Sequence, residues 1–339
     1  MSTKSENVLP AQNNSKFAKW TKRGEWQKPL VIVTFMFVPL VLLFVFTYLP
    51  FFKMFQFSLY DMKYLGAREF VGLDNYVQVF EREDIFGALS LSLYYMGGAI
   101  VQLALALYFA TLLSFKTKGG AFFKGAMFFP YLIGGIAVGF IFKFFYTRGF
   151  VLDTILSWIG FNPENLPYWL KDTSINNISL VATSVWRYLG QNMVLFTGAI
   201  MSVDQEMYEA ADLDGANKWH RFKYIILPSI KTIVVLNLIL SISGSISAFE
   251  PPFVITKGTM GTGTYFVIMH KIAHVNQKVG LASAMAVVLL CIIIVLTIAQ
   301  KLIMNHLFND GDEDESRNAK KVRKAEEKKE KLAAKRMEA

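Results

Sequence analysis

The chain has 339 residues, of which 53% are apolar and 18% are charged, and its mean hydropathy is +0.36. A soluble globular domain carries nearer a quarter of its residues as charges, so an ordinary soluble protein is excluded and several membrane crossings are indicated. The net charge is +9, and the charged residues lie mainly at the two ends and in short segments between long uncharged runs. The excess of positive charge is therefore better explained by the orientation of the chain in a lipid membrane than by nucleic-acid binding. The single cysteine, Cys291, excludes an intrachain disulfide and a cysteine-based metal site.

Six apolar segments predict an all-α integral membrane protein with six transmembrane helices. Each is about the length that a helix needs to cross a bilayer, roughly 18 residues or more. In chain order they are 29–52, 85–115, 125–142, 175–203, 232–249 and 279–300, the fourth being interrupted by Arg187. The first run is too long for a signal peptide and lies too far from the first residue, so we expect it to stay in the mature protein.

Lys and Arg are distributed unequally between the two faces that six crossings create. Most of the 35 basic residues fall in 1–28, in the segments between helices two and three and between four and five, and after the last helix. The N- and C-termini are therefore predicted to be cytoplasmic. We divide the chain into a cytoplasmic arm (1–28), a transmembrane domain (29–306) and a charged cytoplasmic tail (307–339) that is a solvated helix or disordered.

The third and fourth predicted helices differ in what their unusual residues suggest. Gly135 and Gly139 in the third permit close helix packing. In the fourth, Ser184, Arg187, Tyr188 and Gln191 follow the spacing of one helix face, with Trp186 and Asn192 at its margins. Polar residues within a span usually face a cavity, a neighbour or a functional site, so this stripe predicts the lining of a translocation path.

The segment 203–228, VDQEMYEAADLDGANKWHRFKYIILP, is a long and patterned loop between helices four and five. Its apolar residues recur at helical spacing on both sides of Asp214 and Gly215, so we expect two short helices joined there. The Ala-rich, acid-fringed first helix could project from the membrane and dock in a groove of a partner. An amphipathic helix lying in the membrane interface is the alternative, for which Trp219 and Arg221 are suitable.

Ten residues of this loop stand at fixed spacing: Glu209, Ala210, Ala211, Asp214, Gly215, Ala216, Phe222, Ile225, Leu227 and Pro228. They resemble the EAA motif of permease subunits of binding-protein-dependent ABC importers. The sequence GLASA at 280–284 and the six-helix plan resemble the carbohydrate branch of that family. The resemblance covers about residues 29–306.

The resemblance implies a type I ABC importer permease fold in a bacterial inner membrane, importing a carbohydrate, in particular an oligosaccharide. It implies that residues 209–216 couple this chain to a cytoplasmic ABC ATPase dimer, whose ATP-driven closure produces alternating access. It also implies a second homologous permease subunit and an extracellular solute-binding protein. The outer stretch PPFVITKGTMGTGTYF is Gly-rich, as in sugar permeases, but its residues differ from theirs. The resemblance therefore implies no particular sugar.

Within that framework, Trp186, Tyr188, Gln191 and Asn192 could bind sugar hydroxyls and stack on sugar rings. Arg187 has two readings: it meets an acidic sugar, or it snorkels or pairs with a carboxylate of a neighbouring span or subunit. The fifth helix has a second stripe of Asn237, Ser241, Gly244 or Ser245, and Ala248, with Glu250 at its outer end. These small residues border the path or permit tight packing.

The sequence gives little sign of chemistry of its own. There is no GxxxxGK[ST] motif, so ATP is expected to be bound by partner subunits, and no cofactor is expected. His270 and His274 have the spacing of a metal pair but no third ligand near them, and no catalytic residues are predicted. The rival hypotheses are a permease for another solute class, a secondary transporter or channel, for which no repeat or deep carboxylate is evident, and a non-transporting scaffold.

Overall fold

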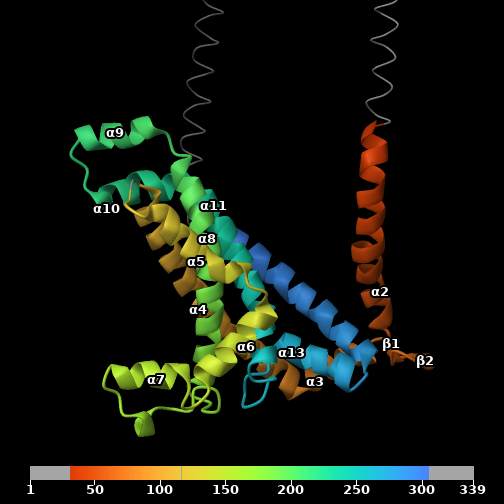
Figure 1. Ribbon diagram of the computed structural model, residues 1–339. Coiled ribbons are helices and arrows are strands. Elements are labelled where there is room, and N and C mark those ends of the chain that lie inside the picture. Colours follow the sequence, from red (N-terminus) through yellow and green to blue (C-terminus); the bar gives the residue numbers. More distant parts are fainter. Residues whose placement is uncertain (1–30, 116, 305–339) are drawn as a thin grey trace, which may run out of the picture. The chain divides into compact units, whose positions relative to one another are not determined.

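The computed structural model describes residues 31–115 and 117–304, which are mainly helical (Figure 1). The chain divides into two units, Met1–Phe57 and Ser58–Ala339. The predicted arm (1–28) and tail (307–339) lie outside the described residues.

The described part of the first unit is one apolar helix, Val31–Phe57. It confirms the helix predicted from residue 29 and continues past the predicted end at Phe52. It contains a π-helical turn, η1 (Phe44–Tyr48), followed by α2 (Leu49–Phe57). Leu49 donates its backbone N–H to the carbonyl of Phe44, immediately before Pro50, which has no N–H to give. The wider turn thus lets the helix continue through a proline.

The second unit is built on long helices, several of which run side by side in Figure 1. They are α4 (Glu83–Ser114), α5 (Gly120–Leu132), α6 (Gly135–Tyr146), α8 (Asn176–Met201), α11 (Leu227–Ile246) and the final helix Val279–Met304. α4 packs extensively on α8 and α11, and α5 packs on α8. The predictions for 85–115, 175–203 and 279–300 are confirmed to within a few residues. The fifth helix begins earlier, because the helical stretch runs from Lys218 to Val254 with small irregularities.

The single helix predicted over 125–142 is broken into two helices in the structure. The chain forms α5 and α6 there, bent by 98° at the break between Leu132 and Gly135. Pro130 lies in the last turn of α5, and Ile133 and Gly134 are extended, with ψ of 131° and 138°. A run of apolar residues indicates that a segment is buried in lipid or protein, but it does not indicate the direction of the helix axis. Hydropathy alone therefore did not predict the break.

In the described ranges 31–115 and 117–304, four helices are long and apolar enough to cross a membrane, and the number is five if the bent pair α5–α6 is one span. α8 has 26 residues, which is sufficient length, but its polar residues keep it out of that set. The apolar helices support a membrane protein with several crossings.

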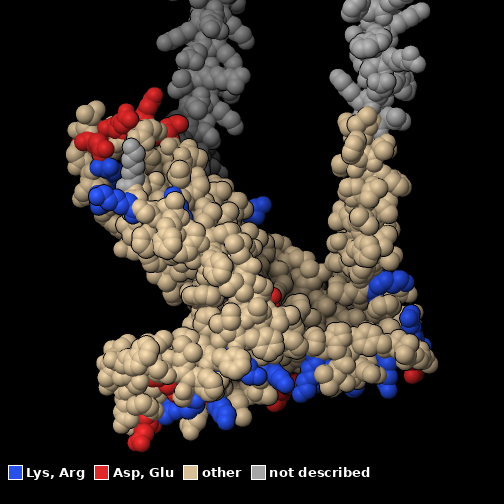
Figure 2. Space-filling view, viewed as in Figure 1, with Lys and Arg blue, Asp and Glu red and all other residues tan. Residues whose placement is uncertain are grey.

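The connecting segments at one end of the second unit carry most of its short elements. They comprise the antiparallel pair β1 (Tyr60–Met62) and β2 (Arg68–Phe70), α3 (Asp74–Glu81), α7 (Val151–Trp158), η2 (Pro163–Asn165), α12 (Glu250–Val254), α13 (Tyr265–His270) and η4 (Lys271–Val275). The other end carries α9 (Gln205–Leu213), α10 (Lys218–Arg221) and η3 (Phe222–Ile226). Figure 2 shows most charged side chains gathered at these two ends of the unit, with a mainly uncharged surface between them.

Three apolar clusters hold the second unit together. One joins α3, α4, α13 and the final helix around Tyr265 and Met285, and one joins α4, α8 and α11 around Phe196 and Ile230. The third, between them, includes Tyr95 and Leu180. The second cluster also includes Tyr208 of α9, so the patterned loop is attached directly to the helix core.

Candidate functional site

The patterned loop folds as two short helices joined at Asp214 and Gly215, as predicted. Gly215 has a φ of +72°, which places it in the left-handed region that glycine adopts without steric cost. Its N–H donates to the carbonyl of Asp212 (3.2 Å), and the N–H of Ala216 donates to the carbonyl of Ala211 (2.9 Å). These two bonds form a Schellman motif, which satisfies the terminal carbonyls of α9 and reverses the chain.

Several contacts brace α9 against α10 and the helix core. Asp212 forms an ion pair with Arg221, and the Nε of Arg221 donates to the carbonyl of Ala216 at 3.3 Å. Tyr208 is buried, its ring contacts that of Phe115, and its burial raises the pKa of the phenol. The loop is therefore a braced projection, whose orientation is set by the helices beneath it.

The projecting surface of the loop combines acids with exposed apolar side chains. Glu209, Ala210, Asp214 and Gly215 are exposed. Leu213 is 90% exposed beside them, and Met207 is 45% exposed. Ala211 is buried and Ala216 is half-buried, so these two members of the motif serve the fold of the loop. The projecting surface of α9 therefore exposes both acidic and apolar side chains.

The predicted stripe on α8 lies beside the bend between α5 and α6. Tyr188 packs on Tyr131 of α5, with ring centroids 6.1 Å apart, and Trp186 packs on Phe142 of α6 at 5.1 Å. Ser184 and Gln191 are half-buried, whereas Trp186 is 41% exposed. The stripe thus forms a partly open surface of aromatic rings and polar groups within the apolar part of the unit.

Arg187 is paired within the chain. Its guanidinium forms an ion pair with the carboxylate of Glu250, the first residue of α12, and donates to the hydroxyl of Tyr188 at 3.2 Å. This is one of the two readings that the sequence left open, namely pairing with a carboxylate of a neighbouring span. Glu250 was noted at the end of the fifth helix, but a separation of 63 residues gave no signal that the two side chains meet.

Three predicted path residues are not on an open surface of the chain. Asn192, Asn237 and Ser245 are each buried and bonded to their own helices. Their side chains donate to the carbonyls of Tyr188 (3.3 Å), Ile233 (2.9 Å) and Ser241 (2.7 Å), respectively. Their role in a translocation path stays a prediction. Ser241 is half-buried.

The glycines predicted to pack closely do so. A Cβ on Gly135 would collide with the carboxylate of Glu250, and a Cβ on Gly139 would lie 2.6 Å from that of Val254. Small residues at the start of α6 therefore allow α12 to approach it.

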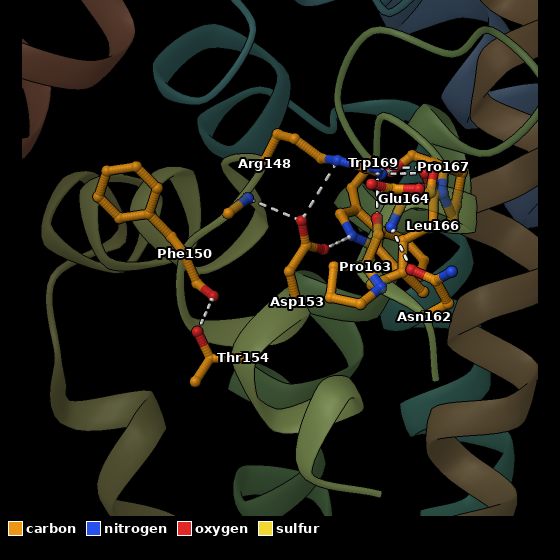
Figure 3. A network of polar contacts seen from close by, with 11 residues as sticks. Arg148, Phe150, Asp153, Thr154, Asn162, Pro163, Glu164, Leu166, Pro167 and Trp169 are labelled. Atoms are coloured by element: carbon orange, nitrogen blue, oxygen red, sulfur yellow. Dashed lines mark hydrogen bonds and ion pairs between the residues drawn. The ribbon is translucent and has the colours of Figure 1, made fainter. Parts of the chain in front are cut away.

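A polar network that the sequence did not reveal fixes the loop after α6 (Figure 3). The carboxylate of Asp153 in α7 accepts from the backbone N–H of Gly149 and from Trp169 Nε1, both at 2.7 Å, and pairs with Arg148 at 3.6 Å. Arg148 also donates to backbone carbonyls of 163–167 and lies over the ring of Tyr168. Asp153 thus ties α7 to the segment that leads into α8.

Replacing Asp153 by alanine is expected to loosen this loop, because it removes the acceptor of two part-buried donors and the charge partner of Arg148. A lost hydrogen bond of this kind costs about 0.5–1.5 kcal/mol. Limited proteolysis of the purified protein in nanodiscs should show faster cleavage within 147–170. Asp172→Ala is the control, since that carboxylate is exposed and bonds only to Ser174; equal cleavage of the two variants would contradict the bracing role.

His270 and His274 lie close together, with ring centroids 4.5 Å apart, and His274 Nδ1 is bonded to the hydroxyl of Tyr64 at 2.7 Å. Among residues 31–115 and 117–304, no group of three or more His, Cys, Asp or Glu could hold a metal ion. Burial and the neighbouring His274 lower the pKa of His270.

Comparisons with known proteins indicate the same family as the motif of the loop. The family described as binding-protein-dependent transport system inner membrane component matches residues 22–308. The arabinooligosaccharides transport system permease protein AraP of Halalkalibacterium halodurans is 30% identical over 72% of this chain and 78% of its own length. The probable starch degradation products transport system permease protein AmyD of Thermoanaerobacterium thermosulfurigenes is 26% identical over 84% of this chain and 96% of its own length.

One similar solved structure is the crystal structure of a bacterial alginate ABC transporter in complex with an alginate pentasaccharide-bound periplasmic protein. One chain of it matches with a TM-score of 0.71 at 18% identity, over 84% of this chain and 97% of that one. The likeness shows a shared fold.

Proposed function

The chain belongs to the family of inner membrane components of binding-protein-dependent transport systems, and we propose that it is the transmembrane permease subunit of an ATP-driven importer of oligosaccharides. The single observation that carries the proposal is the braced helix–turn–helix at 205–221. It presents Glu209, Asp214 and Gly215 of the motif on its exposed side and is fixed to the helix core through Tyr208.

The partners follow from this loop and from the family. An ABC ATPase dimer binds ATP and receives α9 in a surface groove, where Leu213 and its acidic neighbours dock. A second homologous permease subunit completes the path, because one such subunit does not enclose it. An extracellular solute-binding protein delivers the cargo, as the periplasmic protein in the similar alginate transporter suggests. The permease itself needs no cofactor.

Six spans with both termini in the cytoplasm of a bacterial cell complete the proposal. The four apolar helices, the bent pair α5–α6 and α8 supply the six crossings. The loop of α9 and α10 then faces the cytoplasm, on the side with the larger share of Lys and Arg, as the positive-inside rule requires. The network of Asp153 lies on the outer side.

The cargo is assigned from the relatives and from the stripe of α8. AraP and AmyD are named for arabinooligosaccharides and starch degradation products. In this chain Ser184, Tyr188, Gln191 and Trp186 provide hydroxyl, amide and aromatic groups on a partly open surface. Sugar hydroxyls form hydrogen bonds with such polar groups, and the apolar faces of sugar rings stack on aromatic rings.

Purification of the native complex in mild detergent through a tag on this chain tests the proposal. We expect an ABC ATPase and a second permease to copurify. Glu209→Ala should reduce the ATPase recovered by about tenfold, which corresponds to about 1.4 kcal/mol of binding free energy. Glu206→Ala, which removes another exposed acid of α9 outside the motif, should have little effect. Recovery of the chain alone or as a homo-oligomer would contradict the proposal.

A further inference from the structure

The charge of Arg187 has to be compensated, because it lies near the middle of α8. Its side chain is only 14% exposed, and an unpaired cation at this depth is costly. Glu250 supplies the compensation from α12, and Tyr188 adds a hydroxyl acceptor and an aromatic face, 5.0 Å from the guanidinium carbon to the ring centroid. The guanidinium is thus held by two groups of this chain before any cargo arrives.

The position of Glu250 depends on the packing of α12 against α6. Gly135 begins α6 directly after the bend, and its missing Cβ leaves the space that the Glu250 carboxylate fills. Three elements, α6, α8 and α12, therefore meet at the ion pair. The Arg187 side chain is 14% exposed and that of Glu250 is 39% exposed, so the pair is partly open to the surface of this chain.

The other charges of the second unit lie elsewhere. Every other Lys, Arg, Asp and Glu described between residues 58 and 304 lies in a connecting segment or close to the end of a helix. At the depth of the α8 stripe, the described part of the second unit therefore contributes one positive and one negative charge, which cancel. What the stripe offers to a cargo is hydroxyl, amide and aromatic surface.

We propose that the Arg187–Glu250 pair makes this chain's part of the translocation path electrically neutral, so that the importer accepts neutral oligosaccharides and rejects those with carboxylates. This inference rests on the proposed importer function and names its substrate class. The carboxylate of a uronate that enters the path would lose its hydration, and it would find no unpaired cation to bind. Such a desolvated and unpaired charge is unfavourable in a low-dielectric site. Arg187 is a positioning residue that joins α8 to α12.

The first experiment identifies the cargo class. A strain with this gene and one lacking it are given a mixture of neutral arabino- and malto-oligosaccharides and acidic oligogalacturonates, and depletion from the medium is followed by mass spectrometry. We expect depletion that depends on the gene for neutral members only. Gene-dependent depletion of oligogalacturonates would overturn the inference while leaving the importer function intact. If no member is depleted, the carbohydrate assignment fails and the inference fails with it.

The second experiment tests the role of the pair, with uptake of the depleted neutral sugar as the readout. Arg187→Gln and Glu250→Gln should each reduce uptake by about tenfold, because each leaves the charge of the other residue uncompensated. The double variant should recover to within about threefold of the wild type, since neither charge remains. Immunoblots of the membrane fraction correct for the amount of protein. A double variant as weak as Arg187→Gln would overturn the inference, because Arg187 would then act on the cargo directly.

Discussion

Replacing Gly215 by valine is expected to separate ATP hydrolysis from transport while leaving the chain in the membrane. Gly215 has a φ of +72° in the turn between α9 and α10. A non-glycine residue pays about 1–2 kcal/mol in the left-handed region, and β-branched valine is disfavoured further. Because no other atom lies within 4 Å of a Cβ built at Gly215, the effect is on backbone geometry. The turn should open, and α9 should lose its fixed orientation.

The measurement uses the complete importer in proteoliposomes, with cargo uptake and ATP hydrolysis recorded in parallel. Uptake should fall by about tenfold, whereas basal hydrolysis by the ATPase subunits should persist. Gly215→Asn is the matched control, because asparagine tolerates the left-handed region, and it should retain most of the uptake. Normal transport by the valine variant would show that the turn does not serve coupling.

Sequence patterns predicted best where a local signal sufficed. The apolar runs located the long helices, because burial in lipid or protein demands apolar side chains over the whole run. The turn at Gly215 was also predicted correctly, since a glycine that follows an amphipathic segment is a common helix stop. Both features depend on residues close together in the sequence.

The features that could not be predicted depend on what packs against a segment. The bend between α5 and α6 lies within an apolar run, so hydropathy did not separate the two helices. The spacing of Arg187 and Tyr188 defined a face of α8, but it did not identify Glu250, which approaches from α12. Asn237 has the periodicity expected of a path residue, but its side chain is buried and donates to the carbonyl of Ile233 in its own helix. The two three-residue strands are too short to give a period.

Replacing Gly190 is expected to disturb the packing of α8 on α5 strongly. A Cβ there would collide with the backbone carbonyl of Met127 in α5 and lie 2.8 Å from the Cα of Phe128. The obstacle is backbone, so no side-chain rotation can relieve it, and α5 would have to move away from α8. Overpacking in a rigid core costs about 1–3 kcal/mol or more, which is a large part of the stability of a typical domain.

Gly190→Ala should therefore already lower the amount of monodisperse protein in fluorescence-detected size-exclusion chromatography, by about fivefold or more. Gly198 lies in the same helix and has no atom within 4 Å of a built Cβ, so even Gly198→Leu should elute like the wild type. The smaller substitution, which adds one carbon, is thus expected to do more harm than the larger one, which adds four. Helix propensity does not explain such a result, because it favours alanine over glycine. If Gly190→Ala eluted normally while Gly198→Leu did not, the close approach of α5 to α8 would be contradicted.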